Sequence, residues 1–256
     1  MSDTTASVDR IICAAAEAWR HDGEVLATGI GIVPRLAASL CMASINRDLL
    51  MTDSEAWLVQ APVPLGPRGD EAVRRESHMG FARIFDVVWG GRRHAMVGPT
   101  QIDRFGQANI SMIGGDYRRP KAQMLGVRGF PGNSISHANS FFVPNHGPKV
   151  FVEGEVDMVA SAGYNPARLA RGWRLDDIDI RRVVTNLAVL DFGGPARQMR
   201  VLSLHPGVRA EQVQAATGFP LCIPADVPET PAPTPEQCAL LARLDPQQLR
   251  AGALGA

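Results

Sequence analysis

The chain has 256 residues, of which 45% are hydrophobic and 20% are charged, so it can bury a sizeable core without disulfide bonds. Its 26 basic and 26 acidic residues cancel, which leaves no long-range positive field toward phosphate backbones or anionic lipid. This balance disfavours a nucleic-acid partner and a membrane partner.

Neither the cysteines nor the histidines follow a metal-ligand pattern. The 4 cysteines form no CxxC pair and no HxxxH or HExxH occurs, so a zinc site and a disulfide framework are both disfavoured. The N-terminal stretch is polar, and no apolar run approaches the roughly 20 residues that a membrane helix needs. We therefore expect a cytoplasmic protein without a metal site.

The first elements alternate between helix and strand. Apolar spacing and turn residues predict a helix over 7–21, a strand over 24–28, a helix over 34–42 and a strand over 49–52. A strand, a helix and a second strand form the βαβ unit of a parallel sheet, whose ligands bind beyond the carboxyl ends of the strands. Asp53 and Glu55 lie at such an end.

The remaining chain predicts further short elements and no break between domains. Residues 60–75 are rich in proline and glycine and predict a loop. The pattern then predicts a helix near 81–88, strands over 94–97, 150–152, 183–190 and 199–204, a proline-rich segment over 220–233 and a helix over 235–250. We expect an α/β fold in a single domain over residues 1–256.

A Gly-x-Gly turn after the first strand superficially resembles a dinucleotide site. Gly29 and Gly31 would approach a pyrophosphate, and Asp53 would hold a ribose hydroxyl. Pro34 occupies the position of the third glycine, however, and its ring prevents the close helix approach on which that motif depends. A tight turn into a helix is therefore the better interpretation, and an NAD-dependent enzyme is disfavoured.

Two carboxylates are candidate catalytic groups. Asp53 and Glu55 flank a serine at the end of a predicted strand, where burial and neighbours can tune a carboxylate to act as nucleophile or general base. Solvated turn residues have the same pattern, so the sequence leaves both interpretations open.

The glycine stretch from Gly126 to Gly132 is a stronger indication of a binding site. Glycines three residues apart let the backbone approach a ligand and expose N–H groups to an oxyanion or a thioester carbonyl. Arg128 lies inside the stretch, and polar residues follow it. The candidate binding residues lie in this stretch, just after it, and in the run 98–109 before it. They are Gln101, Asn109, Gly126, Gly129, Gly132, Asn133 and His137.

These motifs resemble the β subunits of family I coenzyme A transferases of the glutaconate type. The resemblance rests on the run 98–109 (GPTQIDRFGQAN), on the glycine stretch and on the acid after 49–51. The sequence is more similar still to β subunits of bacterial hydrolases that open steroid rings, over 85–111, 123–137 and 182–208. The resemblance spans roughly residues 7–250.

The resemblance implies a mainly parallel sheet flanked by helices, an α subunit as partner in an α2β2 heterotetramer, and an acyl-CoA substrate at the α/β interface. In the transferases a β-subunit glutamate attacks the thioester; Asp53 matches that position and is one methylene shorter. Arg128 stands where the transferases have a small residue, as it does in the hydrolases. It would stabilise an enolate or a carboxylate that develops on a β-keto acyl-CoA.

Three functions follow, and the sequence leaves them open. The first is hydrolytic carbon–carbon ring opening of a steroid-derived or similar alicyclic β-keto acyl-CoA, with the principal glutamate on the α subunit and with Asp53, Glu55 and Arg128 completing the site. The second is a true CoA-transferase with a covalent intermediate on Asp53 or Glu55. The third is a non-catalytic partner of an active α subunit. Coenzyme A is part of the substrate, so we expect no separate cofactor.

Overall fold

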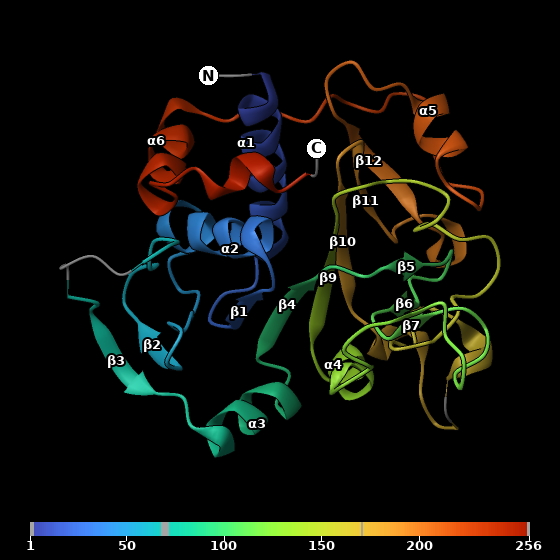
Figure 1. Cartoon of the computed structure of the whole chain (residues 1–256), viewed down its shortest axis with the longest axis horizontal. Coiled ribbons are helices and arrows are strands. Elements are labelled where there is room, and N and C mark those ends of the chain that lie inside the picture. Colours follow the sequence, from blue (N-terminus) through green and yellow to red (C-terminus); the bar gives the residue numbers. More distant parts are fainter. Residues whose placement is uncertain (1–2, 68–71, 170, 255–256) are drawn as a thin grey trace. The chain divides into compact units, whose positions relative to one another are not determined.

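The computed structural model describes residues 3–67, 72–169 and 171–254. The chain forms two compact units (Figure 1). Met1–Val97 and Pro231–Ala256 make the first, and Gly98–Thr230 makes the second. The chain thus returns to the first unit at the end of the proline-rich segment 220–233. The prediction of a single domain stays a prediction.

The first unit combines helices with short strands. Its elements are α1 (Asp3–Ala16), η1 (Glu17–Trp19), β1 (Leu26–Gly29), α2 (Ile32–Ser44), β2 (Trp57–Val59), β3 (Arg75–His78), α3 (Phe81–Trp89), β4 (Arg93–Val97), α6 (Pro235–Leu244) and η5 (Leu249–Gly252). β1 pairs with β4 in parallel, β2 pairs with β3 antiparallel, and α2 packs against α1 and α6. The predicted loop over 60–75 falls partly outside the described residues.

The predicted βαβ unit is present around α2. Leu50 forms a parallel bridge with Leu26 of β1, although residues 49–52 contribute isolated bridges rather than a continuous strand. Gly29 ends β1 directly below the helix: a Cβ atom at this position would lie 2.2 Å from the carbonyl oxygen of Pro34. Only glycine permits this approach, so the Gly-x-Gly turn has a packing role.

A buried ion triad fixes the end of the first unit. Arg250 is 5% exposed, and its guanidinium bonds Asp9 of α1 at 2.6 Å and Asp245 at 3.1 Å. Asp245 also accepts the backbone N–H groups of Leu249 and Arg250. The C-terminal helix therefore ends at Leu244, six residues before the predicted end, because Asp245 closes a turn there.

The second unit is built on strands. Its elements are β5 (Gln101–Ile102), β6 (Ala108–Asn109), β7 (Met112–Ile113), β8 (Ala122–Gln123), α4 (Phe130–Ser136), β9 (Ala138–Val143), η2 (Pro166–Arg168), η3 (Leu175–Asp177), β10 (Ile180–Thr185), β11 (Ala188–Asp191), η4 (Pro195–Arg197), β12 (Arg200–Leu204) and α5 (Ala210–Ala215). β9 pairs with β10 in parallel, whereas β10–β11 and β11–β12 are antiparallel. The segment 220–233 runs along β12 through bridges at Cys222 and Glu229.

Two further predicted strands were wrong: residues 150–152 form only an isolated bridge at Phe151, and residues 183–190 form the end of β10, a turn and β11. Thr185 makes the turn, because its Oγ1 accepts the N–H groups of Leu187 and Ala188, both at 3.0 Å. A threonine hydroxyl can replace a backbone acceptor in this way, so a β-branched run can contain a turn. The α/β fold class, with parallel pairs and covering helices, is confirmed. In the described ranges, no helix is long and apolar enough to cross a membrane.

Candidate active site

Asp53 lies at the predicted strand end, but its carboxylate is engaged by the protein. The side chain is 0% exposed. Oδ1 accepts the backbone N–H groups of Glu55 at 2.8 Å and of Trp57 at 3.0 Å, and Oδ2 lies 2.8 Å from Nη2 of Arg75. The geometry is that of an Asx turn that positions the start of β2.

Glu55 shares the same arginine. Arg75 of β3 reaches across the β2–β3 pair, and its Nη2 donates to Oε2 of Glu55 at 2.6 Å. Arg75 also lies over the ring of Trp57, 5.6 Å from its centroid. One guanidinium therefore brings the two predicted carboxylates together. Glu55 is 56% exposed at its side chain, so it is the more accessible of the two.

The electrostatics of Asp53 favour a permanent anion. Burial raises the pKa of the carboxyl, but the backbone N–H groups of Trp57 and Glu55 and the guanidinium of Arg75 outweigh it, so the pKa is lowered overall. A second arginine lies behind the turn: Arg35 of α2 donates to the carbonyl oxygen of Thr52 at 3.0 Å. Asp53 is thus ionised at neutral pH and surrounded by donors, an arrangement that weakens it as a nucleophile.

Arg128 has a different environment, in the second unit. It is exposed, with φ of 49°, a left-handed conformation that non-glycine residues rarely adopt. Within the described part of the chain its guanidinium has no hydrogen-bond or ion-pair partner. Such strain is typical of functional positions, where the surrounding structure holds the residue in place. The neighbouring Gly126 has φ of 85°, so the loop before α4 is tightly turned.

The glycine stretch divides between a loop and a helix. Gly129 precedes α4 as its N-cap, and Gly132 and Asn133 lie within the helix. The backbone N–H of Asn133 is taken by the carbonyl of Gly129 at 2.9 Å. The stretch therefore continues as a helix after Gly129, because Pro131 in the first turn favours a helix. The prediction that this stretch binds substrate stays a prediction.

Gln101 and Asn109 lie together and bond each other. Asn109 Nδ2 donates to Gln101 Oε1 at 2.7 Å, and its Oδ1 accepts the N–H of Ser111 at 2.9 Å. Asp157 completes the cluster, because its backbone N–H donates to Gln101 Oε1 at 3.0 Å. Both amides are buried, and these contacts stabilise the β5–β6 turn. The prediction that they bind substrate remains a prediction.

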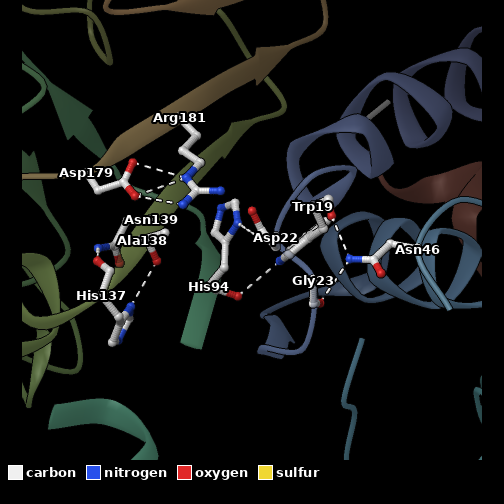
Figure 2. A network of polar contacts seen from close by, with 10 residues as sticks. All are labelled: Trp19, Asp22, Gly23, Asn46, His94, His137, Ala138, Asn139, Asp179 and Arg181. Carbon is white, nitrogen blue, oxygen red and sulfur yellow. Dashed lines mark hydrogen bonds and ion pairs between the residues drawn. The ribbon is translucent and has the colours of Figure 1, made fainter. Parts of the chain in front are cut away.

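His137 follows α4 and is 6% exposed. Figure 2 shows its Nδ1 directed toward the carbonyl oxygen of Ala138, at 2.9 Å, and Asn139 donating to the carbonyl oxygen of His137 at 2.7 Å. In the first unit, the same figure shows a buried hydrogen bond between His94 and Asp22, with 2.6 Å between Nδ1 and Oδ2. Both histidines are part of packed polar clusters.

Asp103 is a buried carboxyl that sequence reasoning missed as a titrating group. Its Oδ1 accepts the N–H groups of Phe105 at 2.9 Å and Gln107 at 3.0 Å. In the described residues, Oδ2 has no hydrogen-bond partner. Burial raises the pKa of Asp103 to about 7, and the charge of Glu155 adds to the effect. Asp103 lies in the run 98–109, and nothing in that motif indicates that its side chain is fully buried.

Comparison with known proteins identifies the family of this chain. No family model matches. The chain is 41% identical to the cholesterol ring-cleaving hydrolase IpdB subunit of Mycobacterium tuberculosis, over 96% of this chain and 97% of that one. The crystal structure of Rhodococcus jostii RHA1 IpdAB superposes with a TM-score of 0.88 at 36% identity, over 98% of both chains. The chain belongs to the IpdB family of ring-cleaving hydrolase subunits.

The IpdB family has the coenzyme A transferase fold. Glutaconate coenzyme A-transferase from Acidaminococcus fermentans matches with a TM-score of 0.79 at 24% identity, over 96% of both chains. At this identity the match shows the fold alone. Within the described residues, no group of three histidine, cysteine or acidic side chains could hold a metal ion.

Proposed function

We propose that this IpdB-family chain is the β subunit of a two-subunit hydrolase that opens a ring of an alicyclic β-keto acyl-CoA, such as one derived from a steroid. The observation that carries the proposal is Arg128, an exposed guanidinium without a protein partner on a strained backbone. A cation left free in this way is suited to bind an oxyanion in the substrate or transition state.

The proposed reaction consumes one water. A base, which we assign to the α subunit, takes a proton from the water, and the oxygen adds to the ring ketone. The bond between the former ketone carbon and the carbon α to the thioester then breaks. Its electron pair forms the thioester enolate, which is protonated on carbon, and the ketone carbon becomes a carboxylate. Arg128 would stabilise the negative charge that develops on oxygen during these steps.

The environment of Asp53 disfavours the transferase alternative. A transferase needs a β-subunit carboxylate that can attack a thioester, and here the matching carboxylate is buried and bonded to Arg75 and two backbone N–H groups. We propose that Asp53 and Glu55 stabilise the β2 turn of the site rather than form anhydride intermediates. Coenzyme A would enter as part of the substrate, without a separate cofactor, and the enzyme would work in the cytoplasm.

Mass spectrometry of the co-expressed two-subunit enzyme tests this function. The enzyme is incubated with an alicyclic β-keto acyl-CoA and an acceptor carboxylate. We expect a ring-opened product that gains one water, with no adduct on the peptide that carries Asp53 and Glu55. A CoA adduct on that peptide, with CoA moved to the acceptor, would instead establish a transferase. Full hydrolysis by an Arg128→Ala enzyme would assign this chain the role of a structural partner.

The apolar face of α3 supports the two-subunit part of the proposal. Phe81, Phe85 and Trp89 are spaced four residues apart and are 87%, 49% and 71% exposed. Aromatic side chains bury about 150–250 Å² each, so this face offers on the order of 400 Å². That is about half of what one partner of a stable interface buries. We propose that the α subunit covers it.

Co-purification tests this assignment. A Phe81→Ser/Trp89→Ser double variant should lose most of its tagged α subunit in a pull-down, whereas Leu249→Ser, which removes another exposed apolar residue of the first unit, should retain it. Equal retention by both variants would show that α3 is not the interface. Circular dichroism of the β subunits checks that each variant is folded.

A further inference from the structure

A pocket of about 380 Å³ in the second unit has no assigned role. One wall is α4, and the others come from residues 159–162, from Arg168 at the end of η2, and from Leu169 and Trp173. Its lining residues are Pro131, Ile135, Val159, Ala160, Ser161, Ala162, Arg168, Leu169 and Trp173. Small-molecule sites in proteins begin at about 300 Å³, so one compact group fits this pocket.

The lining is suited to an apolar ligand. Seven of the lining residues are apolar, and both polar side chains already have protein partners. Ser161 Oγ accepts the backbone N–H of Ala108 at 3.0 Å. Arg168 donates through Nε to Glu155 at 2.8 Å, and the pair forms a salt bridge. Few polar groups of the lining are thus left for a polar ligand, whereas an apolar ligand needs none.

The pocket and Arg128 are connected through α4. Pro131 and Ile135 are four residues apart and therefore lie on one face of that helix, which forms the pocket wall. Arg128 precedes Pro131 by three residues, which places their Cα atoms at most about 11 Å apart. A ligand with its oxyanion at Arg128 and a rigid apolar body could therefore reach the pocket.

We propose that this pocket binds the alicyclic ring body of the acyl group and so selects ring-containing acyl-CoA over straight-chain acyl-CoA. The inference rests on the proposed function, since it assumes that an acyl-CoA reacts at Arg128. Trp173, which is 40% exposed, offers a flat apolar side to one ring face. Ala162 has the smallest side chain among the partly exposed lining residues and leaves room for the ring.

Binding measurements on the co-expressed enzyme test this pocket without any turnover. The probes are two non-hydrolysable thioethers of CoA, one with a bicyclic hydrocarbon ring and one with a butyl chain, titrated by calorimetry. Ala162→Leu should raise the Kd of the bicyclic probe at least tenfold and that of the butyl probe less than twofold. Ala61→Leu fills a different pocket, of about 450 Å³ in the first unit, and should change neither.

A second variant covers the case in which Ala162→Leu does not fold. Trp173→Ala removes an apolar wall without adding bulk, and should also weaken the bicyclic probe selectively. An unchanged Kd for the bicyclic probe, or equal weakening of both probes, would overturn the pocket assignment. If the bicyclic probe binds selectively but the enzyme opens no ring, the proposed function fails and the pocket assignment stands.

Discussion

The two units treat buried charge in opposite ways. In the first unit, three buried carboxylates are paired with arginine: Asp53 with Arg75, and Asp9 and Asp245 with Arg250. In the second unit, the buried titratable groups bond neutral partners, and an arginine is left exposed and unpaired within the described residues. The first arrangement uses charge for structure, whereas the second leaves a cation available for a ligand.

The largest effect should come from breaking the ion triad of the first unit. Arg250→Met leaves two buried carboxylates, Asp9 and Asp245, without their cation, and should lower the free energy of unfolding by about 3–5 kcal/mol. Urea unfolding followed by tryptophan fluorescence measures it. Arg92→Met is the matched control, because it breaks an exposed pair with Glu24, and should change stability by at most about 1 kcal/mol. Similar losses in both variants would refute the contrast.

Loss of Arg128 should lower activity without lowering stability. Arg128→Ala should lower kcat/KM of the two-subunit enzyme by about a hundredfold to a thousandfold, the usual effect of removing an oxyanion donor. Arg128→Gly is the sharper variant, because glycine adopts the positive φ of this position without strain and should stabilise the fold while activity is lost. Arg118→Ala, another exposed arginine of the same unit, should retain activity.

Two titratable groups of the second unit, Asp103 and His146, are buried beside neutral partners. They should make the free energy of unfolding depend on pH in opposite directions. Asp103 has a pKa of about 7 in the folded chain and about 3.9 when unfolded. The folded state therefore holds a proton that the unfolded state releases, and stability falls as pH rises between these values. Burial lowers the pKa of His146 to about 4, against about 6.5 when unfolded. The contribution of His146 to the free energy of unfolding therefore rises with pH between about 4 and 6.5.

Asp103→Asn should reveal the histidine contribution alone. Between pH 4.5 and 6.5, the free energy of unfolding should rise with pH more steeply than in the parent protein, by up to about 1.4 kcal/mol per pH unit. His146→Gln should shift the slope in the opposite direction. Asp226→Asn changes an exposed acid of the same unit and serves as control. A parent-like slope in Asp103→Asn would show that this carboxyl is ionised in the fold.

Local sequence signals predicted the elements well where one residue type decides the structure. A capping box at Thr234 starts α6 at the predicted residue, Pro235, and the predicted strand and helix around Gly29 are present. The failures came from side chains that replace backbone partners. Thr185 forms a turn that divides the predicted strand 183–190 between β10 and β11, and Asp245 ends α6 before the predicted end at residue 250. Such turns depend on a single hydroxyl or carboxylate, and apolar periodicity does not report them.

The candidate site shows the same limit at longer range. The end of the predicted strand located Asp53, and glycine spacing located Arg128. The partner of Asp53 is Arg75, 22 residues later and beyond a segment that contains no pairing signal. The contact exists only because β2 and β3 pair antiparallel. Whether a carboxylate is a nucleophile or a structural anion is decided by such a partner, so the sequence left that question open.

The smallest predicted effect is therefore the one that separates these two roles of Asp53. Asn keeps an acceptor oxygen for the N–H groups of Glu55 and Trp57, and it replaces the charged oxygen that faces Arg75 with an amide NH2. If Asp53 stabilises the turn, Asp53→Asn should leave the hydrolytic kcat of the two-subunit enzyme within about twofold. If it forms a covalent intermediate, kcat should fall by several orders of magnitude, because an amide cannot attack the thioester.

Asp53→Ala is the control for the turn, since it also removes the acceptor oxygen, and it should lower the free energy of unfolding more than Asp53→Asn does. A small loss of kcat in Asp53→Asn, with a larger loss of stability in Asp53→Ala, would assign Asp53 to the paired charges of the first unit and leave Arg128 as the reactive contribution of this chain.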